Sequence, residues 1–459
     1  MVVKLPQLAH VAAVGRLAQQ QFGKRSSRLV AGNFMLLLLE KFVRFGLSFV
    51  VGAWVLRYLG PTRSGSITYV AATVAIMLPL ARLGLDPLLL RDSNQKPEQR
   101  GTMFGSAIAL RAIAGIVLFA ISLGISAVDG NLESNALLVA ILSLVLISQP
   151  YEVFELWFQA SGQVRKPVTA RLTALFILAG LRVASILSGA GILVFAFLQT
   201  LESWITSAIN YAFYRSSRPF PLTPRAKTGL AMLQEGWPYM LSGLMIIVYM
   251  RIDQIMLGNM IDKRAVGIFY AATSLLEAAY FIPTMLNVAL VPTFMQAAAK
   301  DPFRYRAMMS LHINFALFYS MIAAVALHFL APYIILFLYH ERFADSIPVL
   351  QVYAFAYVFV CVGLAQSNWF VVERKGRITL LKSCIGAAVN ILLNLWLIPR
   401  YGVVGAAYST IAAQFAATYG SAILFNRQLL HIQFVLPFST EMRQRLRQSP
   451  GQGAADDAI

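Results

Sequence analysis

The chain alternates long apolar segments with short polar loops along most of its length. An α-helix needs about 20 apolar residues to cross roughly 30 Å of hydrocarbon, where lipid offers no hydrogen-bond partner to a free backbone amide. Twelve segments meet this length, and we expect each to form one transmembrane helix. They lie at residues 31–57, 64–90, 102–127, 135–158, 168–188, 190–214, 234–259, 264–297, 308–331, 346–372, 378–398 and 403–426. The pattern predicts an all-α polytopic membrane protein.

The composition supports this interpretation and narrows the chemistry. Hydrophobic residues make up 58% of the chain and charged residues 13%, with a mean hydropathy of +0.66. A soluble domain carries about 25% charged residues, so a soluble fold is excluded. Cys361 and Cys384 both lie in predicted spans and form no metal-binding pair. The sequence has neither a zinc-protease motif nor a nucleotide-binding P-loop. We therefore expect no metal, no cofactor and no enzymatic activity.

Lys and Arg residues gather in every second loop and in both terminal segments. The basic residues of the opposite loops are few: Arg57, Arg63, Lys263, Arg264, Arg342 and Arg400. Because basic loops are retained in the cytoplasm during insertion, both termini are expected to be cytoplasmic. The spans scatter the formal net charge of +18, which argues against a nucleic-acid partner and for a lipid bilayer. The first 30 residues lack the apolar core of a signal peptide, so no cleaved leader is expected.

A polar stretch with several prolines divides the spans six and six. The expected division is 1–30 for a cytoplasmic or interfacial arm, 31–214 for an N-terminal six-helix bundle, 215–233 for a cytoplasmic linker, 234–427 for a C-terminal six-helix bundle and 428–459 for a cytoplasmic tail. The halves echo each other, since a Leu-Gly pair precedes both Tyr69 and Tyr270 near the start of the following span. Two bundles of equal topology indicate parallel repeats around a central transport cavity.

Charged residues deep inside the spans are the first functional candidates, because each is costly in a membrane unless it is paired or faces water. The deep basic residues are Lys41, Arg44, Arg111, Arg182 and Arg251. The planar fork of donors on a guanidinium matches phosphate or pyrophosphate oxygens. These positions are therefore suited to an anionic lipid headgroup.

The deep acidic residues offer a second chemistry. They are Glu40, Glu202, Asp253 and Glu277. Glu40, Asp253 and Glu277 are candidates for carrying a coupling proton or binding sodium. Structural ion pairs are the alternative, above all for Glu40 and Arg44, which lie four residues apart. Arg251 and Asp253 are two apart and point to different helix faces. Five deep basic residues against four acidic ones do not decide between an anionic and a cationic substrate.

Three stretches of the chain resemble bacterial polysaccharide-unit flippases of the multidrug/oligosaccharidyl-lipid/polysaccharide (MOP) exporter superfamily. The first is RYLGP at residues 57–61 with LGLD at 83–86. The second is RIDQIMLG at 251–258, followed by AVG at 265–267 and YAA at 270–272. The third runs from Asn390 to Ala407 and includes Asn394 and IPRYG at 398–402. The resemblance covers about residues 30–427 and marks the superfamily rather than one substrate.

This resemblance implies two bundles that rock about a central cavity and move an undecaprenyl-pyrophosphate-linked oligosaccharide to the outer leaflet of the bacterial cytoplasmic membrane. It also implies coupling to an ion gradient, of protons or sodium, and work beside polysaccharide polymerases and glycosyltransferases. Cationic cavity residues would receive the pyrophosphate. The candidates by depth and chemistry are Lys41, Arg44, Arg111, Arg182 and Arg251.

Two alternatives remain within the superfamily, a multidrug exporter of lipophilic cations and a flippase of peptidoglycan lipid precursors. A multidrug chamber would favour aromatic and carboxylate side chains. A membrane-embedded polymerase or ligase would need a large outer loop for catalysis. The longest expected outer loop, near residues 332–345, is too short for such a domain.

Overall fold

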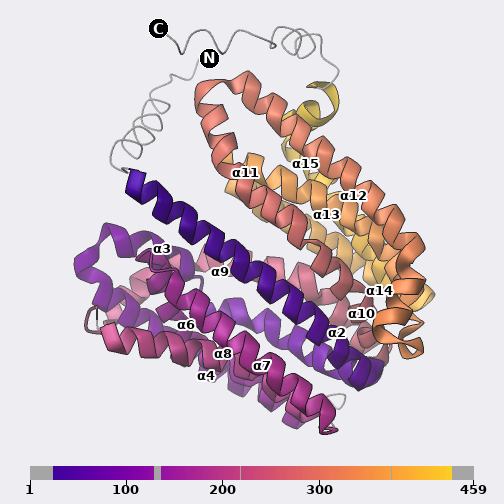
Figure 1. The fold of residues 1–459 in the computed structure, drawn as a ribbon, viewed down its shortest axis with the longest axis horizontal. Helices are drawn as coiled ribbons and strands as arrows, with labels where there is room; N and C mark the ends of the chain where they lie inside the picture. The colour runs from indigo at the N-terminus through magenta and orange to yellow at the C-terminus, as the bar shows by residue number, and fades with distance from the viewer. Residues whose placement is uncertain (1–23, 129–135, 218, 374, 437–459) are drawn as a thin grey trace.

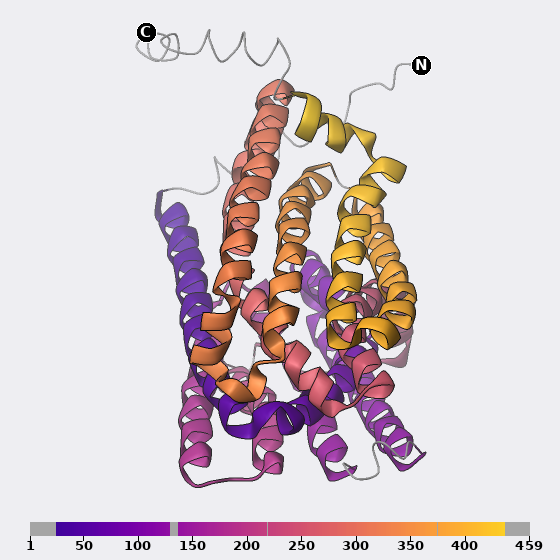
Figure 2. The same ribbon diagram turned by 90° about the vertical axis from the view of Figure 1, so that its right-hand side faces the viewer.

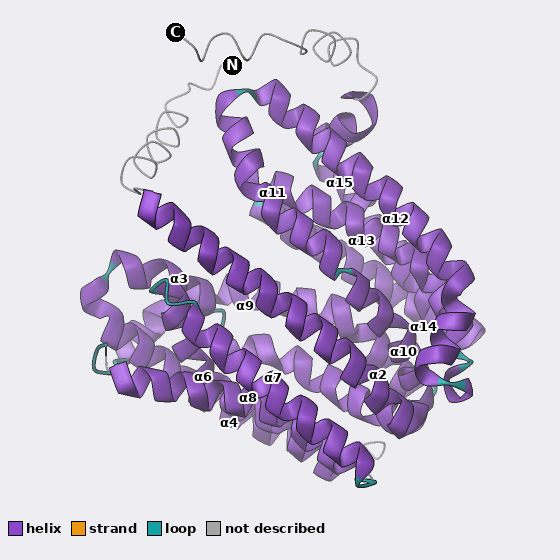
Figure 3. Ribbon diagram, viewed as in Figure 1, coloured by secondary structure: helices purple, strands orange, loops and turns teal. Residues whose placement is uncertain are grey.

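The structure is a computed structural model that describes residues 24–128, 136–217, 219–373 and 375–436. Every regular element in these ranges is helical, as Figure 3 shows. Most of the expected N-terminal arm and the end of the tail lie outside the described residues. The all-α prediction is confirmed.

The helices follow one another with short connections. Their bounds are α2 Lys24–Arg82, α3 Asp86–Gln95, η1 Pro97–Gln99, α4 Arg100–Val128, α6 Ala136–Ala160, α7 Arg165–Leu187, α8 Ile192–Ser217, α9 Ala226–Met260, α10 Lys263–Ala279, α11 Phe281–Lys300, α12 Pro302–Tyr339, η2 Glu341–Phe343, α13 Ser346–Val372, α14 Gly376–Phe415, η3 Ala416–Gly420, α15 Ser421–Phe425, α16 Arg427–Leu430 and η4 His431–Val435. Figure 1 shows them in two lobes, here called the N-lobe (α2–α8) and the C-lobe (α9–α15).

Among the described residues, ten helical segments are long and apolar enough to cross a membrane. The twelve expected spans map onto them because two segments contain a sharp turn. Gly60 in α2 has φ 74° and Gly402 in α14 has φ 58°, both in the left-handed region that favours glycine. The chain reverses at Gly60, so the two arms of α2 are two spans (Figure 1).

Two details differ from the expectation. The expected span 264–297 corresponds to one span, Lys263–Lys300, but it is interrupted at Tyr280, between α10 and α11. Helix α9 begins at Ala226, inside the stretch expected as a linker, and the segment before it packs on α4. There the Thr223 backbone amide donates to the Gly101 carbonyl at 3.1 Å, and the Arg225 amide donates to Ser106 Oγ at 2.9 Å. Gly101 and Gly105 have no Cβ atom and so allow this close approach.

Three clusters of buried apolar side chains explain the two-lobed shape. One contains residues of both lobes, such as Leu56 and Val70 from α2 and Val266 and Ile335 from the C-lobe. A second belongs to α3, α4, α6, α8 and the start of α9. A third belongs to the C-lobe, with Phe294 among its members. The lobes therefore share one core at the end near the Gly60 turn and have separate cores at the other end. In Figure 2 the first and last described residues lie toward that other end.

Candidate functional site

A cavity of about 940 Å³ lies between the lobes. Both arms of α2, together with α6, α7 and α8, line it from the N-lobe, and α9, α10, α11 and the end of α12 line it from the C-lobe. Its volume is at the upper end of the range for small-molecule sites. Apolar side chains form most of the wall, and hydroxyl and amide groups of Gln199, Gln254, Ser274 and Thr284 interrupt it.

The charged lining of this cavity is basic. Lys41 and Arg44 come from α2, Arg182 from α7 and Arg251 from α9, whereas Glu277 of α10 is the one carboxylate among the lining residues. Four of the five basic residues expected to bind pyrophosphate thus share one cavity. When Glu277 and the carboxylates of Glu40 and Glu202 beside Arg44 and Arg182 are counted, four basic side chains face three acidic ones, so the chamber is weakly basic.

Each cavity arginine also contacts an acidic side chain. Arg44 Nε lies 3.0 Å from Glu40 Oε1, Arg182 Nη2 lies 3.5 Å from Glu202 Oε2, and Arg251 Nη1 lies 3.4 Å from Glu277 Oε1. A guanidinium has five N–H donors, so one such contact leaves several free for another acceptor. The arginines are thus held in place and can still bind a ligand.

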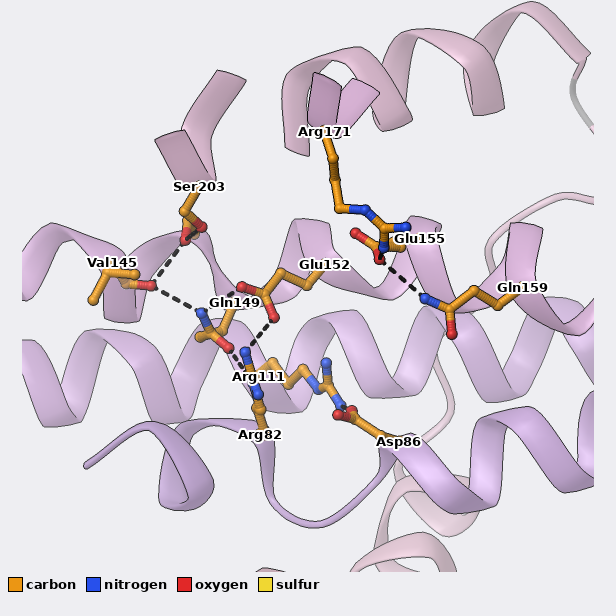
Figure 4. Close-up of polar contacts among 11 residues, drawn as sticks. Arg82, Asp86, Arg111, Val145, Gln149, Glu152, Glu155, Gln159, Arg171 and Ser203 are labelled. Atoms are coloured by element: carbon orange, nitrogen blue, oxygen red, sulfur yellow. Dashed lines mark hydrogen bonds and ion pairs between the residues drawn. The ribbon is translucent and has the colours of Figure 1, made fainter. Parts of the chain in front are cut away.

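Arg111, the fifth expected basic residue, is not in the cavity. It is fully buried in α4, where its Nη2 pairs with Asp86, as Figure 4 shows. Beside it, Arg82 donates to Gln149 Oε1 and Glu152 Oε2, both at 2.9 Å. The first pair joins α3 to α4, and the second set of contacts joins α2 to α6. The structure therefore gives Arg111 an internal partner in the N-lobe.

Asp253 is also outside the cavity, on the far face of α9 from Arg251. Its carboxylate accepts hydrogen bonds from Asn394 Nδ2 and from Thr410 Oγ1, the latter at 2.9 Å, and all three residues are buried. Asn394 Nδ2 also donates to Asn390 Oδ1 at 3.1 Å. In the described part of the chain, Asn394 Oδ1 and Asn390 Nδ2 are buried without a hydrogen-bond partner. This is a second polar site, between α9 and α14.

The ion pair of Glu40 with Arg44, which the sequence offered as an alternative, is present in the structure. Sequence reasoning did not single out the partners of Asp253 or the second partner of Glu40, Arg171. Asn390 and Asn394 appeared only as part of the resemblance, although two amides four residues apart in an apolar run were a usable signal. In the structure Arg171 belongs to α7 and reaches Glu40 of α2.

The cavity is closed at the Gly60 end by direct packing of the two lobes. A Cβ atom on Gly65 would lie 1.7 Å from the Lys263 carbonyl oxygen, and one on Gly267 would lie 1.9 Å from the Pro61 carbonyl oxygen. Tyr69 Oη donates to Asn259 Oδ1 at 2.5 Å, and Lys263 Nζ lies 3.2 Å from the centre of the Tyr69 ring. Backbones this close leave no passage at this end.

Comparison with known proteins places the chain in a family. The model of the polysaccharide biosynthesis protein family matches residues 30–298, more than half of the chain. The chain belongs to this polysaccharide biosynthesis protein family. A second model, that of lipid II flippase MurJ, matches residues 241–444. Both families consist of transporters and flippases, and the expected membership of the MOP superfamily is confirmed.

Solved structures share the fold of this polysaccharide biosynthesis protein. Lipid II flippase MurJ in an inward closed conformation is 14% identical, with a TM-score of 0.69 over 88% of this chain and 90% of that one. A MATE multidrug transporter of the MOP superfamily is 15% identical in its inward-facing conformation, with a TM-score of 0.67 over 86% and 96%. An outward-facing MATE structure is 14% identical, with a TM-score of 0.53 over 88% and 96%.

One relative is detected by sequence over a shorter range. An uncharacterized membrane protein of Methanocaldococcus jannaschii is 27% identical over 135 residues, which are 28% of this chain and 26% of the relative. The match thus spans about a quarter of the length of that relative.

Together, the family models and the shared fold show that the protein is a multi-pass membrane transporter of the MOP superfamily.

Proposed function

We propose that this protein flips undecaprenyl-pyrophosphate-linked oligosaccharides from the cytoplasmic to the outer leaflet of the bacterial cytoplasmic membrane. The protein would serve the export of surface polysaccharide. It would work beside the glycosyltransferases that build the oligosaccharide unit and the polymerase that uses it. The observation that carries this proposal is a basic cavity between the lobes of a polysaccharide biosynthesis family member.

The chemistry of the cavity fits a diphosphate. Guanidinium groups make short, charge-assisted and often bidentate contacts with phosphate oxygens. Arg44 and Arg251 approach the chamber from different lobes, so one diphosphate between them would touch both halves of the protein. Lys41 and Arg182 would add charge, and the amide and hydroxyl groups of the wall would contact the sugars.

The direction of transport follows from the charge of the loops. Basic loops lie at the end where the lobes have separate cores, and this end is assigned to the cytoplasm. The closed packing of Gly65 and Gly267 is then on the outer side. The higher TM-score to the inward-facing than to the outward-facing MATE structure supports an inward-facing state. Alternating access requires the lobes to separate at the outer end and close at the cytoplasmic end.

We assign ion coupling to Asp253. Glu40 and Glu277, the other expected candidates, hold cavity arginines. Asp253 is instead surrounded by the side chains of Asn390, Asn394 and Thr410, which can supply oxygen ligands to a small cation or hydrogen bonds to a protonated carboxyl. Arg251 and Asp253 share one helix, α9, which offers a physical link between the cavity and the ion site.

A flippase of peptidoglycan lipid precursors is the second candidate. The match of the MurJ model to residues 241–444 favours it, and its cargo carries the same diphosphate. A multidrug exporter of lipophilic cations fits less well, because the lining holds four basic residues and one carboxylate.

Deletion of the gene tests the proposal. Lipids extracted from cells that lack the protein are expected to contain an accumulated prenyl-pyrophosphate oligosaccharide, while the matching surface polysaccharide disappears. The intact gene should reverse both changes. Accumulation of peptidoglycan precursor instead would select the second candidate. Unchanged lipids with raised sensitivity to cationic drugs would contradict both.

A further inference from the structure

Glu40 is held by two arginines at once. It is 3% exposed, and its Oε1 lies 3.0 Å from Arg44 Nε and 3.3 Å from Arg171 Nε. Arg171 Nη2 also donates to Glu40 Oε2 at 3.3 Å. Arg171 therefore contacts both carboxylate oxygens, whereas Arg44 contacts one. Among these three residues, only Arg44 lines the cavity.

Arg171 is itself anchored away from the cavity. Its Nη1 lies 2.6 Å from Glu155 Oε1 on α6, and Gln159 Nε2 donates to the same oxygen at 3.0 Å (Figure 4). The side chain of Arg171 is 19% exposed, against 37% for Arg44. Two guanidinium groups and two carboxylates thus form a charge-balanced set in which Arg44 is the most exposed member.

This arrangement determines what happens when Arg44 changes partner. A buried carboxylate that loses its only cation is strongly destabilised, and this would oppose any movement of Arg44 toward a ligand. Because Arg171 already contacts both oxygens of Glu40, the carboxylate remains paired when Arg44 turns away. The cost of releasing Arg44 is then small.

We propose that Arg171 is a positioning residue that keeps Glu40 neutralised and so leaves Arg44 available to a diphosphate in the cavity. The inference rests on the proposed function and adds a residue outside the cavity to its binding machinery. Without Arg171, Arg44 is the remaining cation beside Glu40, and the carboxylate then keeps Arg44 in the ion pair. Affinity for the anion is then lost although every cavity residue is intact.

The test is binding of farnesyl diphosphate, a short soluble prenyl diphosphate, to the purified full-length protein in detergent. Arg171→Gln is expected to weaken binding about tenfold or more, as for the loss of one charge-assisted contact. Glu40→Gln together with Arg171→Gln is expected to restore affinity to near the wild-type value, because Arg44 is then free. A residue with a merely structural role would not be rescued by removing a second charge.

Two further variants complete the design. Arg165→Gln, the same change at an exposed position of α7, is the matched control and should bind normally. Glu40→Gln alone should bind at least as tightly as wild type, and it tests the inference even if Arg171→Gln does not fold. Weaker binding by Glu40→Gln, wild-type affinity in Arg171→Gln, or a double variant as weak as Arg171→Gln would overturn the inference alone. No binding by the wild-type protein would contradict the proposed function, and the inference with it.

Discussion

Arg251 and Asp253 show how one helix serves two sites. The two residues are separated by one position in α9, so their side chains leave the helix on different faces. Arg251 meets the cavity and Glu277, while Asp253 meets Asn394 and Thr410 inside the C-lobe. In the function proposed above, one turn of this helix would therefore carry both a contact to the substrate charge and the site of the coupling ion.

The arginines of the chamber can be tested singly. Arg44→Ala and Arg251→Ala are each expected to reduce transport about ten- to a hundredfold, because a hydrogen bond to a charged group contributes about 1.5–3 kcal/mol. Lysine at either position should retain part of the transport activity, since it keeps the positive charge but lacks the planar set of N–H donors of a guanidinium. The measurement is surface polysaccharide per unit of protein in the membrane.

Arg57→Ala is the control for these variants. Arg57 is exposed on the same helix as Arg44 and does not line the cavity. It should leave transport unchanged. Full transport by both alanine variants of the cavity would rule out binding of the diphosphate by these arginines.

Asp253 makes a different prediction. Asp253→Asn keeps a side chain of the same shape beside Asn394 and Thr410 but removes the charge that an ion would neutralise. We expect transport in proteoliposomes to lose its dependence on a proton or sodium gradient, while binding of farnesyl diphosphate is retained. An unchanged response to both gradients in this variant would show that the coupling ion binds elsewhere.

At the scale of elements, the turn in α2 and the start of α10 form the closed contact at the Gly60 end, which we assign to the outer side. Gly65 and Gly267 each face a backbone carbonyl of the other lobe, so any side chain at either position would collide with main chain. Small residues at helix contacts allow such close approach in membranes. Besides this packing, the Tyr69–Asn259 hydrogen bond and the Lys263–Tyr69 cation–π contact hold the lobes together here. In the proposed transport cycle this contact would have to part.

Gly65→Val should force this contact open. We expect a cysteine at Ser274, in the cavity wall, to react with an impermeant maleimide added outside the cell when Gly65 is replaced. Gly46→Val is the matched control. Gly46 lies on the same helix as Gly65, but a Cβ atom there would meet no neighbouring atom within 4 Å. Equal labelling in the two variants would mean that the glycine contact does not seal the outer side.

Hydropathy predicted the elements and the turns near Gly60 and Gly402, but not the break at Tyr280. The reversal at Gly60 was expected because polar residues around Arg63 separate two apolar runs. The break at Tyr280 was not, because residues 264–297 read as one apolar run. Tertiary contacts accompany it: Tyr357 Oη donates to the Ala279 carbonyl at 3.2 Å. This break lies next to Glu277 and Phe281 in the cavity wall.

At the scale of the whole molecule, the arrangement of the cores accounts for the cavity. One core joins the lobes at the Gly60 end and two separate cores stabilise the other ends, so a pivot of the lobes would leave these two cores intact. The sequence located the charged residues that matter but not their grouping. The sequence placed Arg111 and Asp253 inside spans, as it did Arg44, and only the three-dimensional packing shows that they have partners outside the cavity.

The charge of the cavity lining illustrates the same limit of prediction from sequence. Along the chain, deep basic and acidic residues nearly balance. In space, Glu40, Glu202 and Asp253 do not line the chamber, and the lining retains four basic residues and Glu277. Which helix face borders the cavity depends on contacts between residues far apart in sequence, and a hydropathy pattern does not contain that information.

Translocation by the purified protein tests the central claim most directly. The protein would be reconstituted into vesicles that carry a prenyl-pyrophosphate oligosaccharide on one leaflet, and its arrival on the other leaflet followed with an added glycan-cleaving enzyme. We expect translocation with the wild-type protein and its loss in the Arg44→Ala, Arg251→Ala double variant. Equal translocation by both proteins, or none by the wild type, would contradict a basic cavity that carries the diphosphate.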